Sequence, residues 1–165
     1  MVIILIGMPG CGKTCMGKAL GRKLKLKVID GDALIEKKYE RKLHEIIEEH
    51  GLEEFKRIEE EILLSISGDD IVISTGGSAI YYDSVMQYFK SIGTVVYLDV
   101  NLKILKQRLG DFSKRGVVLQ NGQTLDELYR ERTELYKKYA DVTVNCSGNA
   151  FPRYQQEVID AVTKK

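Results

Sequence analysis

Short apolar runs alternate along this 165-residue chain with longer stretches in which apolar residues recur every three or four positions. The runs are rich in Val, Ile and Leu, which is typical of strands buried on both faces of a parallel sheet. They predict strands at Val2–Ile6, Lys27–Ile29, Ile71–Ser74, Thr94–Asp99 and Val142–Asn145. Because helical patterns separate these strands, the chain is expected to form right-handed βαβ units and hence a doubly wound α/β sheet.

The periodic stretches predict amphipathic helices. We expect them at Lys13–Leu24, Ala33–Lys38, Leu43–Glu49, Leu52–Ser65, Ser84–Ser91, Leu102–Leu109, Leu125–Tyr139 and Arg153–Thr163. A chain of this length suits one sizeable core, so residues 1–165 are expected to form a single domain.

Two segments depart from the alternation of strands and helices. Residues 31–60 are almost all helix-forming or charged and contain no strand pattern, which indicates a helical insertion above the strand ends. Residues 110–124 have no steady period and contain three glycines together with Lys114 and Arg115. In a phosphate-binding enzyme such a segment is a candidate lid, and the alternative is a solvated surface loop.

Charge and hydropathy exclude several classes of protein. The chain has 25 Lys and Arg against 24 Asp and Glu, a net charge of +1, so it lacks the basic surface of a nucleic-acid-binding protein. No apolar stretch approaches the roughly 20 residues that span a bilayer, and Val2–Ile6 is too short for a signal peptide. We therefore expect a cytoplasmic monomer with neither nucleic-acid nor membrane partners.

The three cysteines, Cys11, Cys15 and Cys146, are odd in number and lack the spacing of a zinc site. They are therefore expected to be free thiols. Cys11 lies in a glycine-rich loop and is either an oxidisable thiol or a small residue that the loop tolerates.

The strongest chemical signal is the sequence Gly-Met-Pro-Gly-Cys-Gly-Lys-Thr at residues 7–14. It follows a predicted strand and precedes a predicted helix, which is the setting of the phosphate-binding P-loop. The glycines allow backbone N–H groups to point at phosphate oxygens, and the helix dipole adds to the attraction. Lys13 is expected to reach the β- and γ-phosphates of ATP, and the Thr14 hydroxyl to bind Mg²⁺. The residues expected to contact the nucleotide here are Gly10, Cys11, Gly12, Lys13, Thr14 and Cys15.

Two further strands end in residues suited to ligand binding, since α/β sheets bind ligands at the carboxyl ends of their strands. Asp30 and Asp32 follow the second strand, where one can help to hold Mg²⁺ while the other accepts a hydroxyl proton. The alternative is a turn with a helix cap. Thr75-Gly76-Gly77-Ser78 follow the third strand, where small residues let backbone N–H groups approach an anion; the alternative is a flexible turn. No acidic residue ends that strand, so Asp30 would replace the usual Walker-B aspartate.

Charged residues at 53–61, and Arg130 and Arg132 further along, are explained by default as solvated helix faces with i,i+3 and i,i+4 pairs. Spacing alone does not say which of these cations faces a site.

Six segments spread over nearly the whole chain resemble the shikimate kinase family, of the nucleoside-monophosphate-kinase-like P-loop group. They are Gly-Met-Pro-Gly-Cys-Gly-Lys-Thr, Ile-Asp-Gly-Asp, Glu-Phe-Lys-Arg-Ile-Glu-Glu, Ser-Thr-Gly-Gly-Ser, Lys-Arg-Gly-Val-Val-Leu and Arg-Thr-Glu-Leu-Tyr-Lys-Lys-Tyr-Ala-Asp. The resemblance implies a three-layer P-loop kinase fold, with helices on both faces of a five-stranded parallel sheet in the order 2-3-1-4-5. It also implies a lid at 110–124, a substrate-binding insertion at 31–60, and conversion of ATP and shikimate to ADP and shikimate 3-phosphate, a step of aromatic amino acid biosynthesis.

The resemblance also implies roles for single residues of this chain. Lys13, Asp32 and Arg115 match catalytic positions, with Asp32 placed as the base that touches the substrate hydroxyls. Thr14 and Asp30 match the Mg²⁺ positions. The remaining matches are Arg108 against adenine, Arg115 at the phosphates, Lys56, Gly76, Gly77, Ser78 and Arg132 around the substrate, and Glu59 orienting a substrate-binding cation.

Three departures from the family's pattern fall on the substrate side. Lys56 stands where the family usually has arginine, so it keeps the charge but loses the bidentate fork. Arg57 is adjacent but about 100° away around a helix, so it cannot simply replace that arginine. Ser78 ends the family's glycine triplet, and residues 116–118 read Gly-Val-Val in place of Pro-Leu-Leu.

ATP-dependent phosphorylation is therefore better supported than shikimate itself as the acceptor. The alternatives are a kinase of another small hydroxy acid and a non-catalytic nucleotide-binding module. A binding module has no need of a base or a lid arginine, so the retained residues argue against the second alternative. These residues are Lys13, Asp32, Arg115 and Arg132.

Overall fold

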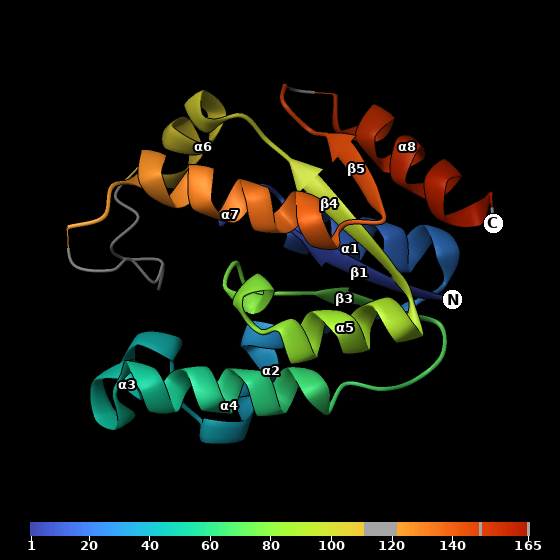
Figure 1. Cartoon of the computed structure of the whole chain (residues 1–165). Coiled ribbons are helices and arrows are strands. Elements are labelled where there is room, and N and C mark those ends of the chain that lie inside the picture. The colour runs from blue at the N-terminus through green and yellow to red at the C-terminus, as the bar shows by residue number, and fades with distance from the viewer. Residues whose placement is uncertain (111–121, 149, 165) are drawn as a thin grey trace.

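A five-stranded, fully parallel sheet in the order β2-β3-β1-β4-β5 forms the centre of the molecule (Figure 1). The computed structural model describes residues 1–110, 122–148 and 150–164. The strands are β1 (Val2–Ile6), β2 (Lys27–Asp30), β3 (Ile71–Ser74), β4 (Thr94–Asp99) and β5 (Val142–Asn145). The predicted strand order and parallel direction are confirmed, and β2 alone differs from its predicted bounds, by one residue.

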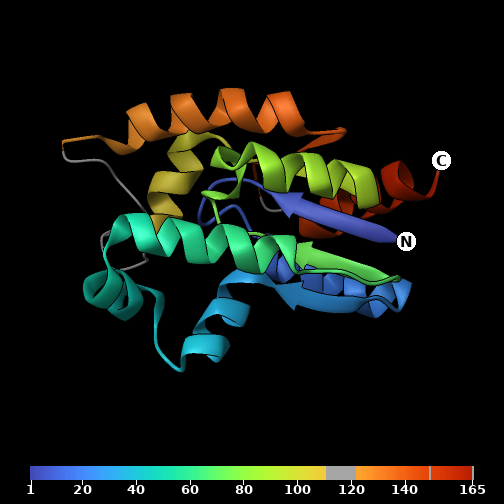
Figure 2. The same ribbon diagram turned by 60° about the horizontal axis from the view of Figure 1, so that its bottom comes forward.

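Helices cover both faces of the sheet, which gives the three layers that the sequence predicts (Figures 1 and 2). α1 (Lys13–Leu24) and α8 (Phe151–Thr163) pack on one face, and α5 (Asp83–Ile92) and α7 (Leu125–Tyr139) pack on the other. The other helical elements are α2 (Gly31–Tyr39), α3 (Leu43–His50), α4 (Leu52–Leu64), α6 (Leu102–Leu109) and the short 3-10 helix η1 (Ala79–Tyr81). Each predicted helix is present within two residues of its predicted bounds, whereas η1 was not predicted.

Local sequence explains where the helices around the sheet's carboxyl edge begin. The Asp30 carboxylate accepts a hydrogen bond from the backbone N–H of Ala33 at 3.1 Å and so caps α2. Thr124 and Glu127 form a capping box at the start of α7. α1 begins differently, because Gly12 has a φ of 98° and supplies no side-chain cap. The first N–H groups of α1 are therefore available to an anionic ligand.

The main core follows the central strands β1, β3 and β4, whose residues are nearly all buried. The expectation that every strand is buried on both faces is wrong for the two edge strands. Lys27 and Val28 of β2 are exposed, as are Thr143 and Asn145 of β5. An edge strand has one neighbour only, and the helical layers centre on the middle of the sheet, so its outer residues stay in contact with water.

Helices α2, α3 and α4 share a small hydrophobic cluster that is separate from the main core. Its buried members are Ile35, Ile46, Phe55, Ile58 and Ile62. The three helices project beyond the β2 side of the sheet (Figures 1 and 2). This arrangement is compatible with the helical insertion expected at residues 31–60, whose role in substrate binding is a proposal taken up below.

No helix within the described ranges is long and apolar enough to span a membrane.

Candidate active site

A cavity of about 350 Å³ lies at the carboxyl edge of the sheet, where the P-loop, the ends of β2 and β3, and helices α4 and α7 meet. Most of the residues singled out in the sequence line this one space. Its lining consists of Pro9, Gly10, Gly12, Lys13, Thr14, Cys15, Asp30, Asp32, Leu43, Phe55, Glu59, Ser74, Thr75, Gly76, Gly77, Ser78 and Arg132.

The P-loop holds the side chain of Lys13 against its own backbone. The Lys13 ammonium donates hydrogen bonds to the carbonyl oxygens of Gly7, at 2.7 Å, and Met8, at 3.0 Å. Gly10 and Gly12 have φ values of 79° and 98°, a left-handed conformation that side chains other than glycine rarely adopt. The loop therefore has the backbone of a phosphate cradle, with a buried cation at its centre.

Asp30 and Thr14 provide two neighbouring hard oxygen ligands. The Thr14 hydroxyl lies 3.5 Å from Asp30 Oδ2, while the other carboxylate oxygen caps α2. Asp30 can therefore cap α2 with one carboxylate oxygen and bind a metal ion with the other. Within the described residues no group of three His, Cys, Asp or Glu side chains could hold a metal. A Mg²⁺ ion shared with nucleotide phosphates needs only one or two protein ligands, so these two residues fit it.

Asp32, in the first turn of α2, brings a half-buried carboxyl into the cavity. Burial raises the pKa of this carboxyl to about 7, and the negative charges of Glu59 and Asp30 act in the same direction. Lys13 opposes them and lowers the pKa. A carboxyl that titrates near neutral pH can accept a proton from a hydroxyl group, because both its protonated and its ionised forms are populated there.

Gly76 and Gly77 bring the backbone after β3 close to charged side chains. An added Cβ on Gly76 would lie 2.8 Å from Asp32 Oδ1 and 3.3 Å from Glu59 Oε2. On Gly77 it would lie 2.5 Å from Arg132 Nη1. Both positions therefore require glycine for the close approach, which supports the functional interpretation of this turn over that of a merely flexible one.

Arg132 is the largest fully buried side chain of the described residues, with 1% of its surface exposed. Its guanidinium carbon lies 5.4 Å from the centre of the Tyr81 ring, a cation–π distance. The default expectation of a solvated position is therefore wrong for Arg132. The positive charge of Arg132 favours ionised Glu59 and lowers the pKa of that carboxyl, although burial raises it more.

Glu59 is also buried, with 3% of its surface exposed. The Ser78 hydroxyl donates a hydrogen bond to Glu59 Oε1 at 2.7 Å, and the Tyr82 hydroxyl also hydrogen-bonds the carboxylate. The serine that replaces a glycine therefore has a partner within the site.

Comparisons with known proteins identify the family. The family model for shikimate kinase matches residues 9–163. The chain belongs to the shikimate kinase family. A shikimate kinase from Francisella tularensis subsp. novicida is 36% identical over 150 residues, covering 88% of this chain and 85% of that protein.

Solved members of the shikimate kinase family share the whole fold. The structure of shikimate kinase from Acinetobacter baumannii in complex with shikimate has a TM-score of 0.88 at 28% identity and covers 99% of this chain and 93% of its own. The structure of shikimate kinase from Aquifex aeolicus has a TM-score of 0.85 at 29% identity, with coverages of 99% and 96%.

A second group of relatives has a different name and a greater length. The human protein threonine synthase-like 1 is 38% identical over 162 residues, which covers 97% of this chain. The chain spans only 21% of that relative's length.

Lys56, which stands where the shikimate kinase family usually has arginine, does not line the main cavity. Its ammonium lies 3.4 Å from Glu53 Oε1, one turn earlier on α4, and the side chain is 41% exposed. It lines a neighbouring cavity of about 230 Å³. Ser78 and Phe55 line both cavities, so the structure places Lys56 next to the site but not in it.

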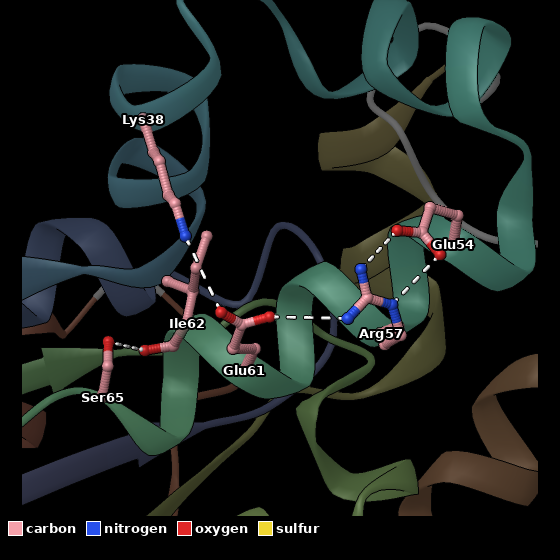
Figure 3. Close-up of polar contacts among 6 residues, drawn as sticks. All are labelled: Lys38, Glu54, Arg57, Glu61, Ile62 and Ser65. Atoms are coloured by element: carbon pink, nitrogen blue, oxygen red, sulfur yellow. Dashed lines mark hydrogen bonds and ion pairs between the residues drawn. The ribbon is translucent and has the colours of Figure 1, made fainter.

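Arg57 does not take the place of the missing family arginine either. Its guanidinium is held on the outer face of α4 by Glu54, at 2.5 Å, and by Glu61, at 3.7 Å (Figure 3). Lys38 of α2 lies 3.9 Å from the same Glu61 carboxylate. These ion pairs place Arg57 on the solvated side of the helix, as its angular distance from Lys56 predicts.

A third cavity, of about 330 Å³, lies beside the P-loop. Arg108 lines it and donates a hydrogen bond to the carbonyl oxygen of Gly10 at 3.2 Å. The contact with adenine expected of Arg108 stays a prediction. All three cysteines line this cavity as well, and each is a free thiol as expected. Arg115, and most of the lid expected at 110–124, lie outside the described residues.

Three tyrosines of the site were missed in the sequence: Tyr81, Tyr82 and Tyr136. Tyr136 lies one helical turn after Arg132 on α7, and its hydroxyl donates a hydrogen bond to the carbonyl oxygen of Gly77 at 2.9 Å. The i,i+4 spacing from Arg132 is the signal that could have identified it.

Proposed function

We propose that this chain transfers the γ-phosphoryl group of ATP to a hydroxyl group of a small carboxylate-bearing molecule, with shikimate as the first acceptor to test. The observation that carries the proposal is the position of Asp32, whose half-buried carboxyl lines the same cavity as Lys13 and Thr14 of the P-loop. A hydroxyl bound between these groups would face both a proton acceptor and the phosphate-binding loop.

The residues of the P-loop are proposed to hold the nucleotide. The backbone N–H groups from Gly10 to Cys15 would bind phosphate oxygens, and the Lys13 ammonium would exchange its carbonyl partners for the β- and γ-phosphates. Thr14 and Asp30 would hold Mg²⁺, which supplies neutralisation of phosphate charge when it is bound. Arg108 is proposed to contact adenine and Arg115 to contact the phosphates.

On the acceptor side, the carboxylate of the substrate is proposed to bind Arg132. Backbone N–H groups around Gly76 and Gly77 would bind an acceptor hydroxyl. Asp32 would accept the proton of the hydroxyl whose oxygen attacks the γ-phosphorus. Arg132 can bind a carboxylate through two parallel hydrogen bonds, which would fix the orientation of the acceptor as well as its affinity.

A small hydroxy acid other than shikimate is the second candidate acceptor. Two observations favour it: Lys56 is paired with Glu53 outside the main cavity, and relatives of this chain include threonine synthase-like proteins as well as shikimate kinases.

The test is ATP consumption by the purified protein with Mg²⁺ and a panel of hydroxy acids that includes shikimate. Lys13→Ala should lower kcat by about a hundredfold or more, because a charged contact to the transferring phosphoryl group is lost. Lys18→Ala on the exposed side of α1 is the matched control and should retain activity. Acceptor-independent ATP consumption, or full turnover by Lys13→Ala, would refute the proposed phosphoryl transfer.

A further inference from the structure

The acceptor end of the main cavity contains an adjacent pair of opposite charges. Glu59 comes from α4 and Arg132 from α7, and both side chains are buried, with 3% and 1% of their surfaces exposed. Their end groups approach two consecutive glycines: Glu59 Oε2 lies 3.3 Å from the point that a Cβ of Gly76 would occupy, and Arg132 Nη1 lies 2.5 Å from the corresponding point of Gly77. A ligand that carries both a carboxylate and an ammonium on one carbon atom offers the complementary pair of charges.

The carboxylate of Glu59 reaches the edge of the cavity beside Gly76. Ser78 donates its hydroxyl to Oε1, whereas Oε2 lies 3.3 Å from the point that a Cβ of Gly76 would occupy. Asp32 Oδ1 lies 2.8 Å from the same point. Two carboxylates, one buried and one half-buried, therefore approach the same glycine at the edge of the cavity.

Among the described residues that line this cavity, acidic side chains outnumber basic ones. The Lys13 ammonium is bound by P-loop carbonyl groups, and Lys56 is paired with Glu53 outside the cavity. An acceptor with a carboxylate alone would match Arg132 but would bring a further negative charge next to Asp32 and Glu59, which is costly in a low-dielectric site. An acceptor with an added ammonium would neutralise part of that charge.

Resting on the proposed kinase activity, we propose that the acceptor is a hydroxy amino acid, whose carboxylate binds Arg132, whose ammonium binds Glu59 and whose hydroxyl faces Asp32. In the transfer, the hydroxyl oxygen forms a bond to the γ-phosphorus of ATP while the bond from that phosphorus to the β,γ-bridging oxygen breaks. ADP leaves with the electron pair of that bond, and the hydroxyl proton passes to Asp32. The product is a phosphorylated amino acid, so a reaction that consumes an O-phospho amino acid is the class that would follow.

The experiment compares amino acids with partners that lack only the ammonium. The probes are L-serine, L-threonine and L-homoserine against 3-hydroxypropanoate, 3-hydroxybutanoate and 4-hydroxybutanoate, with shikimate alongside. Binding is measured by calorimetry with the protein saturated with Mg²⁺ and a non-hydrolysable ATP analogue, and turnover is measured with ATP. At least one amino acid should bind at least tenfold more tightly than its partner and should have a higher kcat/KM than shikimate.

The outcomes separate this inference from the proposed kinase activity. Phosphorylation of shikimate with no selective binding of any amino acid overturns the inference and leaves the kinase activity standing. Selective binding of an amino acid without phosphoryl transfer supports the inference about the ligand and refutes the kinase activity. Equal affinity for every amino acid and its partner overturns the inference whatever the turnover.

Glu59→Gln tests the residue itself, because it removes the charge while keeping a group that can accept the Ser78 hydrogen bond. It should reduce the preference for the amino acid over its partner to less than threefold, mainly by raising KM for the amino acid. Glu61→Gln, on the exposed face of α4, is the matched control and should keep the full preference. If Glu59→Gln does not fold, the comparison of the six probes on the unaltered protein still decides the matter.

Discussion

Asp32 has one role in its own helix and another in a cavity formed by distant segments of the chain. It lies in the first turn of α2, where an acidic residue suits the helix dipole. Its carboxyl lines a cavity shared with residues from the P-loop, the ends of β2 and β3, and helices α3, α4 and α7. The sequence left a helix cap and a proton acceptor as alternatives for the pair Asp30 and Asp32. The structure separates the capping role, because Asp30 accepts the capping hydrogen bond from Ala33, while both carboxyl groups line the cavity.

This division makes Asp32→Asn a sharp test of the proposed base. Asparagine keeps the shape of the side chain and a polar group in the first turn of α2, but it cannot accept the hydroxyl proton. The kcat should therefore fall by at least about a hundredfold. Affinity for an ATP analogue, measured by calorimetry, should change little. An active Asp32→Asn enzyme would show that Asp32 is not the base and that its burial serves structure alone.

The three cysteines should differ in reactivity although they line one cavity. Cys15 is exposed, whereas Cys11 and Cys146 are each 4% exposed, and burial raises the pKa of the Cys146 thiol to about 12. A thiol reagent should therefore label one thiol quickly and two slowly in the native protein. The fast phase of labelling, measured by absorbance, should disappear in the Cys15→Ser variant. In the unaltered protein it should slow down when ADP is present. A fast phase that survives in Cys15→Ser would place a second reactive thiol at the surface.

At the scale of elements, the strands and helices follow closely from the sequence, whereas the site follows only in part. Continuous apolar runs and 3.6-residue periods give the bounds of β1 and α7, because burial of those elements is dictated by their own residues. Which strands lie at the edge of the sheet depends on the strand order, so the exposure of Val28 was missed. Similarly, the burial of Arg132 depends on η1 and α4, which lie about fifty residues or more away in the chain.

The orientation of Lys56 could not be predicted for a related reason. The family resemblance places residue 56 at the site, but a flexible lysine side chain can pair with any nearby carboxylate. In the structure its partner is Glu53 at i−3. The substitution of lysine for arginine was visible in the sequence, while its consequence for the cavity was not.

Two glycines of α1, Gly17 and Gly21, allow a test of how this helix packs on the sheet. An added Cβ at Gly17 would meet only ordinary contacts, at 3.7 Å or more, so Gly17→Ala should raise the free energy of unfolding by about 0.5–1 kcal/mol. At Gly21 it would clash with the side chain of Val28 and lie 3.0 Å from the carbonyl oxygen of Leu26. Gly21→Ala should therefore lower the free energy of unfolding by more than 1 kcal/mol in urea titrations. Equal effects of the two substitutions would contradict this packing of α1 against β2.

At the scale of the whole molecule, the site is assembled from the P-loop, β2, β3, α4 and α7, which meet only in the folded chain. Two acids of this site, Asp32 and Glu59, have pKa values in the folded chain that differ from their ordinary ones. Burial raises the pKa of Asp32 to about 7 and also raises the pKa of Glu59. Global stability should therefore depend on pH through the residues of the site.

The sign of this dependence follows from proton binding. Between the unfolded pKa of Asp32, 3.8, and its folded pKa of about 7, the folded chain binds more protons than the unfolded one, so stability falls as pH rises through that window. The favourable contribution is complete below the unfolded value and is lost above pH 7.

The Asp32→Asn variant cannot ionise at this position. Its free energy of unfolding, relative to that of the unaltered protein, should therefore rise by roughly 2 kcal/mol between pH 5.5 and pH 8. Urea titrations at the two pH values measure this gain, and Asp69→Asn, at an exposed aspartate, is the control that should show none. A gain that is absent, or larger at pH 5.5, would mean that the Asp32 carboxyl is already ionised throughout this range and is not held neutral by its burial.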